Sequence, residues 1–141
     1  MFWNSKKSCD EAATIAEKVN CEAEGLYRSG KMHCAEAVLV AVKNQFRPDL
    51  PDEVSRAAAG FGGGSGAGCL CGAVVGGTIA FGLVIPDDRK KVARLTKELH
   101  HWFKGEYHST CCRTIRSEFK GICAELTGRV AGQVAEMLLE D

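Results

Sequence analysis

The amino-acid sequence predicts an all-α fold, a compact bundle of five to seven helices around a buried, glycine-rich central helix. Several segments carry apolar residues at helical spacing, and none alternates apolar and polar residues for long enough to make a convincing strand. One uncharged stretch, residues 57–85, holds most of the glycines. With 141 residues, of which 45% are hydrophobic and 26% charged, the chain is expected to form one cysteine-rich domain over residues 1–141.

The first half of the chain is expected to form three helices. They span residues 9–29, residues 34 to the Arg47–Pro48 step, and residues 52–59. The capping box that Ser8 begins predicts the start of the first helix. The second, apolar along most of its length, ends before Pro48 because proline disfavours helical geometry in the preceding residue. Gly60 stops the third.

The central helix is expected over residues 69–85, buried on all sides, with Pro86 ending it. Residues 60–68 are a loop by composition. The apolar length and the Gly72-xxx-Gly76 spacing also resemble a membrane-spanning helix. Once the loop is removed, however, the apolar segment is marginal in length and diluted by glycine. We therefore expect no membrane span.

Three further helices are expected in the last third of the chain. They span residues 88–104, a segment that Ser109 caps and Gly121 breaks, and a segment after Gly128 that ends at residues 137–139. Asp87 and Asp88 cap the first of these, whose apolar residues fall on one face while the charged residues stay in water. Cys123 is expected in or just after the turn that precedes the last helix.

The charge balance limits the classes of binding partner, and the N-terminal residues indicate the cellular compartment. Eighteen Lys and Arg balance 18 Asp and Glu, so no net field draws the protein to nucleic acid or to an acidic membrane surface. Residues 1–7 lack the long apolar run of a signal peptide, which favours a cytoplasmic location. In that compartment clustered cysteines more often bind metal or do redox chemistry than form structural disulfides.

Cysteine is the unusual component of the composition, at eight of 141 residues. The cysteines stand at positions 9, 21, 34, 69, 71, 111, 112 and 123. No C-x-x-C occurs, which excludes thioredoxin-type redox motifs, paired zinc knuckles, the bacterial ferredoxin run and c-type haem attachment. Cys9 and Cys21, in the first helix, are expected to be small buried hydrophobic residues. The other six form a long-range set that converges only if the helices bring their ends together.

Four converging thiolates suit a [2Fe–2S] or [4Fe–4S] cluster, or a tetrahedral zinc ion. The candidate metal ligands are Cys34, Cys69, Cys71, Cys111, Cys112 and Cys123. Because adjacent residues point in different directions, we expect only one of Cys111 and Cys112 to be a ligand. Cys71 stands where a helix begins, and the positive end of the helix dipole is expected to lower the pKa of its thiol.

The glycine-rich loop has two interpretations. Its glycines let the backbone approach a cofactor and present N–H groups to the sulfurs of a cluster. The candidates for this role are Gly62, Gly64, Gly66 and Gly68. Equally, the loop is a plain connector. Dinucleotide binding is disfavoured because no strand precedes the loop, and a P-loop is excluded because Cys69 and Leu70 replace its lysine and hydroxyl. The histidines show no metal-ligand spacing and are expected to be ordinary surface or boundary residues.

These features together resemble the redox-active family named for its pattern C_GCAxxG_C_C. The resemblance covers about residues 25–140 and rests on Cys34, the glycine loop leading into residues 68–77, the Cys111/Cys112 pair and Cys123. It implies a small, mostly helical domain with redox activity. Similar domains occur joined to haem modules in split-Soret cytochromes, for which an iron–sulfur centre is expected.

Residue by residue, Cys34 matches the first cysteine of the family pattern and Cys123 matches the last. The second cysteine of the pattern, in its GCAxxG part, corresponds to Cys69 or to Cys71. Neither alignment reproduces every residue of that part of the pattern. We favour Cys71 as the second cysteine because it stands at a helix start, and we keep Cys69 as a substitute ligand. We favour Cys112 over Cys111 as the third cysteine. Because no C-x-x-C-H occurs, the chain cannot hold the covalent haem of the cytochrome relatives.

Three functions follow as hypotheses. The first is an iron–sulfur protein for electron transfer or redox sensing, with the cluster on Cys34, Cys71, Cys112 and Cys123. The second is a metal-free dithiol/disulfide oxidoreductase or thiol sensor, in which a pair of the same cysteines cycles. The third is a structural zinc protein that binds a partner. The sequence does not identify the redox partner, and the glycine-lined apolar segment favours a homodimer. No other acid–base or nucleophilic constellation points to a hydrolase or a transferase.

Overall fold

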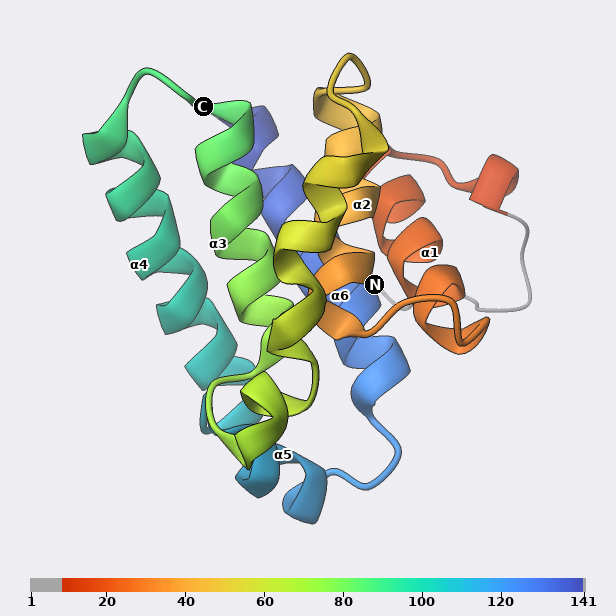
Figure 1. The fold of residues 1–141 in the computed structure, drawn as a ribbon, viewed down its shortest axis with the longest axis vertical. Helices are drawn as coiled ribbons and strands as arrows, with labels where there is room; N and C mark the ends of the chain where they lie inside the picture. The colour runs from red at the N-terminus through yellow and green to blue at the C-terminus, as the bar shows by residue number, and fades with distance from the viewer. Residues whose placement is uncertain (1–8, 141) are drawn as a thin grey trace.

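The computed structural model describes residues 9–140 and shows a bundle of α-helices (Figure 1). The α-helices are α1 Ile15–Arg28, α2 Cys34–Phe46, α3 Gly72–Val84, α4 Arg89–Tyr107, α5 Cys112–Glu118 and α6 Cys123–Glu140. Shorter helical segments are η1 Cys9–Glu11, η2 Asp52–Phe61 and η3 Gly64–Gly68. Within the described residues, β-pairing is confined to a single bridge between Leu70 and Cys111. The predicted all-α fold is confirmed.

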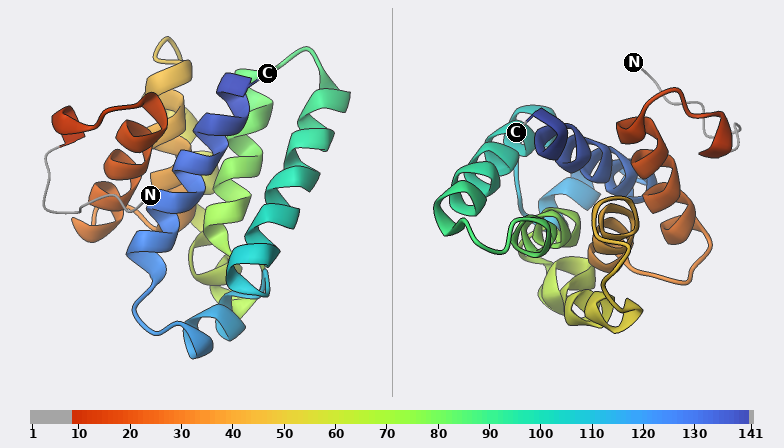
Figure 2. Two further views of the ribbon diagram at one scale, coloured as in Figure 1. Left: turned by 180° about the vertical axis from the view of Figure 1, so that it is seen from behind. Right: turned by 90° about the horizontal axis from the view of Figure 1, so that it is seen from above.

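The direction of the helices decides which ends meet. Helices α2, α3 and α6 run in one direction, while α1 and α4 run in the opposite direction (Figures 1 and 2). The starts of α2, α3 and α6 therefore lie at the same end of the bundle, where the short helix α5 also lies (Figure 1). The ends of α3 and α6 and the start of α4 lie at the opposite end (Figure 1).

Helix α3 occupies the predicted central position, in contact with α2, α4 and α6. Gly76 lets α3 approach α2 closely, because a Cβ atom there would overlap the carbonyl of Ala35. Phe81 is completely buried between the helices. The prediction that α3 is buried on all sides is wrong in part: its neighbours leave one strip partly open, with Gly82 exposed and Ile79 half-buried.

The core of the bundle forms from the apolar faces that the sequence pattern indicates. On α4, Leu95, Leu99 and Phe103 are buried at helical spacing, and Asp88 caps this helix by accepting a hydrogen bond from the Lys91 N–H at 3.0 Å. Burial of each such large side chain contributes about 1.5–3 kcal/mol. No helix among the described residues is both long enough and apolar enough to cross a membrane.

The N-terminal part differs from the predicted single helix over residues 9–29. Ser8, the predicted cap, lies outside the described residues. Helix α1 begins only at Ile15, because Thr14 adopts an extended conformation and its hydroxyl accepts the Glu17 N–H at 3.1 Å. The chain before Thr14 turns away from the helix axis as η1.

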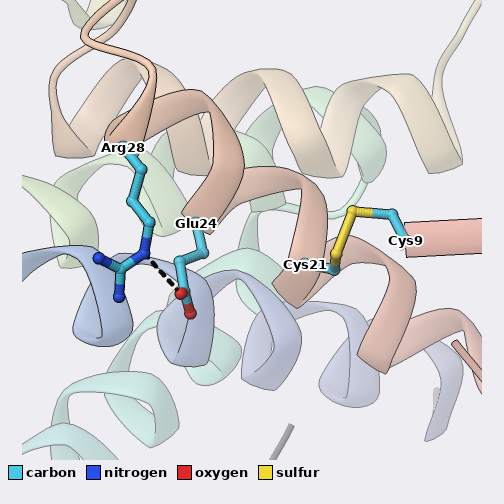
Figure 3. Close-up of a disulfide and its surroundings, with 4 residues drawn as sticks. All are labelled: Cys9, Cys21, Glu24 and Arg28. Carbon is cyan, nitrogen blue, oxygen red and sulfur yellow. Dashed lines mark hydrogen bonds and ion pairs between the residues drawn. A yellow bond between two sulfur atoms is a disulfide. The ribbon is translucent and has the colours of Figure 1, made fainter. Parts of the chain in front are cut away.

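This turn brings two cysteines together, which corrects the prediction that Cys9 and Cys21 are unpaired buried thiols. They form a disulfide with their Cα atoms 5.5 Å apart (Figure 3). A continuous helix would hold residues 12 positions apart at about 18 Å, far beyond disulfide reach. The interruption at Thr14 therefore makes the bond possible, and the bond ties η1 to α1.

The last helix also starts earlier than predicted. Helix α6 begins at Cys123, and Gly128 lies inside it rather than before it. Gly128 serves close packing: a Cβ atom there would overlap the side chain of Asn20, so glycine lets α6 pack against α1. The break at Gly121 is confirmed, since its φ of 75° is a left-handed conformation that glycine adopts at low cost.

Candidate functional site

Four cysteines stand at the starts of four helices. Cys34 is the first residue of α2, Cys71 directly precedes α3, Cys112 is the first residue of α5, and Cys123 is the first residue of α6. Because α2, α3 and α6 are parallel, three of these helix starts meet at one end of the bundle, where α5 closes it (Figure 1). The fold thus brings residues from four distant segments together.

These four cysteines line a single cavity of about 880 Å³. Cys71 and Cys112 are buried, while Cys34 and Cys123 are half-buried. The rest of the wall includes Gly62, Gly63 and Gly72 next to the thiols, and Tyr27, His33, Arg116 and Lys120 nearer to solvent. The sulfurs that the sequence analysis groups together therefore share one site, beside the glycine loop. Their roles as ligands or as redox thiols remain predictions.

Gly72 sets the position of Cys34. A Cβ atom at residue 72 would lie 2.5 Å from Cys34 Sγ and 2.7 Å from the carbonyl oxygen of Phe61. Both distances are far below ordinary van der Waals contact, so only glycine leaves room for this sulfur at the start of α3. Burial raises the pKa of the Cys34 thiol, and the neighbouring Gly63 and Ala35 N–H groups offset part of the rise. The backbone thus both admits this sulfur and offsets part of the effect of its burial.

The predicted lowering of the Cys71 pKa is wrong. Burial raises the pKa of the Cys71 thiol to about 12, the neighbouring Cys34 adds to the rise, and the Ala73 and Val74 N–H groups offset only part of it. Burial is also the main cause that raises the pKa of Cys34. Removal of a thiolate from water outweighs the helix dipole here. In the metal-free protein these two thiols therefore stay protonated near neutral pH and are weak nucleophiles.

The other two candidate cysteines lie outside the cavity. Leu70 and Cys111 pair in the single β-bridge, in which the Cys71 N–H donates to the Thr110 carbonyl at 2.8 Å. Cys69 is exposed, and the half-buried Cys111 thiol donates to the carbonyl of Gly68 at 3.3 Å.

The surroundings of Cys111 lower the pKa of its thiol, whereas those of Cys71 raise it. Hydrogen bonds from the Thr114 side chain and backbone lower the pKa of Cys111, and Arg113 adds to the effect. Neighbouring side chains in extended backbone point to opposite sides. Cys71 and Cys112, which follow the bridged residues Leu70 and Cys111, therefore line the cavity, and the bridged residues do not.

The glycine loop takes part in the site with its first residues only. Of the four predicted cofactor-binding glycines, Gly62 lines the cavity, whereas Gly64, Gly66 and Gly68 do not. Gly64 instead packs against Cys112 Cβ and the backbone of Cys69, which needs both the absence of a side chain and its φ of 65°. The loop curls into a left-handed turn, and its later glycines lie outside the cavity wall.

Thr127 is a cavity residue that the sequence analysis misses. It is completely buried, and its hydroxyl oxygen has no hydrogen-bond partner among the described residues. An unpaired buried hydroxyl costs about 1–3 kcal/mol, and each such group in a native structure calls for an explanation. Thr127 stands four residues after Cys123, on the same face of α6, and this spacing is the signal that could have identified it.

Tyr27 on α1 is a second cavity residue that sequence patterns do not reveal. Burial raises the pKa of the Tyr27 phenol, and the neighbouring Cys123 thiol adds to the rise. His33, expected as a surface residue, is exposed, and its side chain forms the cavity wall against Gly62. The side of the site toward α1 is therefore polar, with hydroxyl and imidazole groups beside the sulfurs.

The thiols of the cavity do not form a ready-made site for a single metal ion in the described part of the chain. Within residues 9–140, no three or more Cys, His, Asp or Glu side chains lie close enough together to hold one metal ion. Sulfurs bound to one zinc ion at about 2.3 Å must nearly touch each other, whereas the ligands of a cluster surround several metal atoms. Four thiols spread around one cavity, glycine N–H donors and the unpaired Thr127 hydroxyl are the groups that a bound cluster would use.

Comparison with known proteins gives one match. No curated protein and no solved structure matches the chain. A family model described as "Putative redox-active protein (C_GCAxxG_C_C)" matches residues 32–137, a range that contains all four cavity cysteines and the glycine loop. The match spans three quarters of the chain, and the protein therefore belongs to this C_GCAxxG_C_C family.

Proposed function

We propose that the protein is a one-electron carrier or redox sensor that holds an iron–sulfur cluster on Cys34, Cys71, Cys112 and Cys123. The observation that carries this proposal is that these four cysteines, from the starts of four helices, line one cavity. Cysteine thiolates are the usual ligands of both [2Fe–2S] and [4Fe–4S] clusters, which supply one-electron exchange at a potential set by hydrogen bonds and burial.

The chain's own groups support a negatively charged occupant. The N-terminal ends of α2, α3 and α6 carry partial positive charge, and the first residue of each of these helices lines the cavity. Of the residues in the described part of the chain that line it, none is acidic, whereas Arg28, Arg116 and Lys120 are basic. The Gly63 N–H at Cys34 and the Thr127 hydroxyl are donors for cluster sulfurs. Such donors stabilise the reduced, more negative state.

Anaerobic reconstitution tests the proposal. Metal-free protein is incubated with iron and sulfide, desalted, and examined by visible absorption with iron and sulfide assays. We expect a coloured protein whose iron content falls when any of the four cavity cysteines is changed to serine. Cys69→Ser and Cys111→Ser are the matched controls, because these thiols lie outside the cavity, and both are expected to keep the cluster.

Two results would overturn the cluster. One is a colourless, iron-free protein after anaerobic reconstitution. The other is equal loss of iron in the control variants, which would show that the cavity does not define the ligand set. Elemental analysis of the purified protein covers the zinc alternative, since one zinc per chain together with redox silence would favour a structural zinc module.

Metal-free dithiol exchange is the second candidate function, and Cys111 is the observation that favours it. Its lowered pKa and the exposed Cys69 on the facing segment suit thiolate chemistry at the surface. Oxidation of two thiols to a disulfide would release two protons and pass two electrons to a disulfide of a partner. Thiol titration across a redox gradient checks this: a two-electron midpoint in metal-free protein that Cys111→Ser abolishes would support it.

A further inference from the structure

The charged side chains around the cysteine cavity are of one sign. In the part of the chain that the structure describes, the cavity wall contains Arg28, Arg116 and Lys120 and no Asp or Glu. The whole chain has equal numbers of acidic and basic residues. The positive charge at this end is therefore a local feature and not a consequence of composition.

The positive surface extends beyond the cavity along α5. Arg113, Arg116 and Lys120 are all exposed. Arg113 and Arg116 lie three residues apart on α5, and Lys120 follows the end of this helix and lines the cavity together with Arg116. Arg116 borders both the cavity and a second hollow of about 460 Å³, which Arg113 and the glycine loop also line. We call Arg113, Arg116 and Lys120 the basic rim.

The basic rim is not neutralised within the described chain. Arg28, on the other side of the cavity, is held by Glu24 at 2.8 Å (Figure 3). Among residues 9–140, by contrast, no carboxylate lies within ion-pair distance of a rim residue, and Arg113 donates only to the carbonyl of Ala67 at 3.4 Å. Uncompensated exposed charges of one sign create a field that attracts an oppositely charged surface.

We propose that the basic rim is the docking surface for an acidic one-electron carrier protein that exchanges electrons with the group in the cavity. This inference rests on the proposed function for its redox step. With a cluster held by the four cavity cysteines, one electron would pass from the reduced cofactor of the carrier to the oxidised cluster, so the carrier would be oxidised by one electron and the cluster reduced by one. No bond is made or broken. Charge complementarity speeds the encounter and orients the two sites.

Transfer kinetics test the docking surface, with bacterial flavodoxin, an acidic one-electron carrier, as the probe. The second-order rate of electron transfer from reduced flavodoxin to the reconstituted protein is measured over a range of ionic strength. We expect the rate to fall as salt rises, because surface charges are screened. Arg116→Glu with Lys120→Glu is expected to lower the low-salt rate at least about tenfold and to remove its fall with salt.

The matched control changes the same net charge elsewhere. Lys90→Glu with Lys97→Glu alters two exposed residues of α4, which begins at the opposite end of the bundle (Figure 1). This variant is expected to stay within about twofold of the wild-type rate. Arg113→Glu, which does not line the cavity, separates docking from cluster binding and is expected to slow transfer several-fold with unchanged iron content. Equal effects of the two double variants, or a rate independent of salt, would overturn the proposal.

A second readout does not require a cluster. Carbodiimide couples flavodoxin carboxylates to nearby lysine amines, and mass spectrometry identifies the lysines. With metal-free protein at low salt we expect coupling at Lys120 and not at Lys90 or Lys97. Coupling at Lys120 to a protein that never becomes coloured would keep the docking surface and remove the cluster. A coloured protein without Lys120 coupling would keep the cluster and remove the docking surface.

Discussion

Replacement of Gly72 by alanine tests whether close packing positions the thiols of the cavity. The new Cβ atom would lie 2.5 Å from Cys34 Sγ, whereas ordinary contact begins near 3.4 Å, so the sulfur must retreat by about 0.9 Å. The carbonyl oxygen of Phe61, at 2.7 Å, must move by about 0.7 Å. Cys34 is therefore expected to swing away from the cavity that the other three thiols line.

The energetic cost follows from two opposing effects. Overpacking of this kind costs about 1–3 kcal/mol, and the higher helix propensity of alanine returns at most about 1 kcal/mol. The net expectation is a loss of about 1–2 kcal/mol in the free energy of unfolding. Gly82→Ala is the control on the same helix: nothing lies within 4 Å of its Cβ position, so it should stabilise the protein by about 0.5–1 kcal/mol.

Urea unfolding of the metal-free variants at neutral pH measures the stability difference. Alkylation with iodoacetamide, mapped by mass spectrometry, measures the exposure of Cys34, which should rise in Gly72→Ala and stay unchanged in Gly82→Ala. If the two variants prove equally stable and Cys34 is equally protected in both, the reasoning from close packing is refuted.

Three further predictions concern the metal-free protein. Burial raises the Cys71 pKa from 9.0 to about 12, so the contribution of this thiol to the free energy of unfolding is complete below pH 9 and is lost as pH rises toward 12. Urea unfolding across this range should show a loss that is smaller by up to about 4 kcal/mol in Cys71→Ala, where the remaining loss comes from other groups whose pKa burial raises, Cys34 among them. Thr127→Val removes an unpaired buried hydroxyl while keeping its shape, so chemical unfolding should show a gain of about 1–2 kcal/mol, and a loss would mean that the hydroxyl has a partner. Reduction of the disulfide between Cys9 and Cys21, 12 residues apart, should lower the free energy of unfolding by up to about 3 kcal/mol, and a protein with both cysteines changed to serine should no longer respond to reductant.

Much of the site could be predicted because cysteine spacing and helix signals are local. The spacing of apolar residues on α4 and the proline after α2 give those helices without knowledge of their neighbours. The positions of Cys34, Cys71 and Cys112 close to helix starts are likewise visible in the chain. Gly128 shows the limit: a glycine that usually marks a helix boundary lies mid-helix, because α1 packs too close for any side chain.

By itself, the sequence determined the helical fold class, the exclusion of the C-x-x-C motifs and the set of cysteines that had to be considered. Only the tertiary structure decided which sulfurs face the cavity, because that depends on the parallel course of α2, α3 and α6 and on the bridge between Leu70 and Cys111. It also decided that Cys71 is a poorly ionised thiol, since a helix start is visible in the chain but the burial that outweighs its dipole is not. The disulfide of Cys9 and the unpaired hydroxyl of Thr127 likewise depend on how segments pack in three dimensions, which the order of residues along the chain does not reveal.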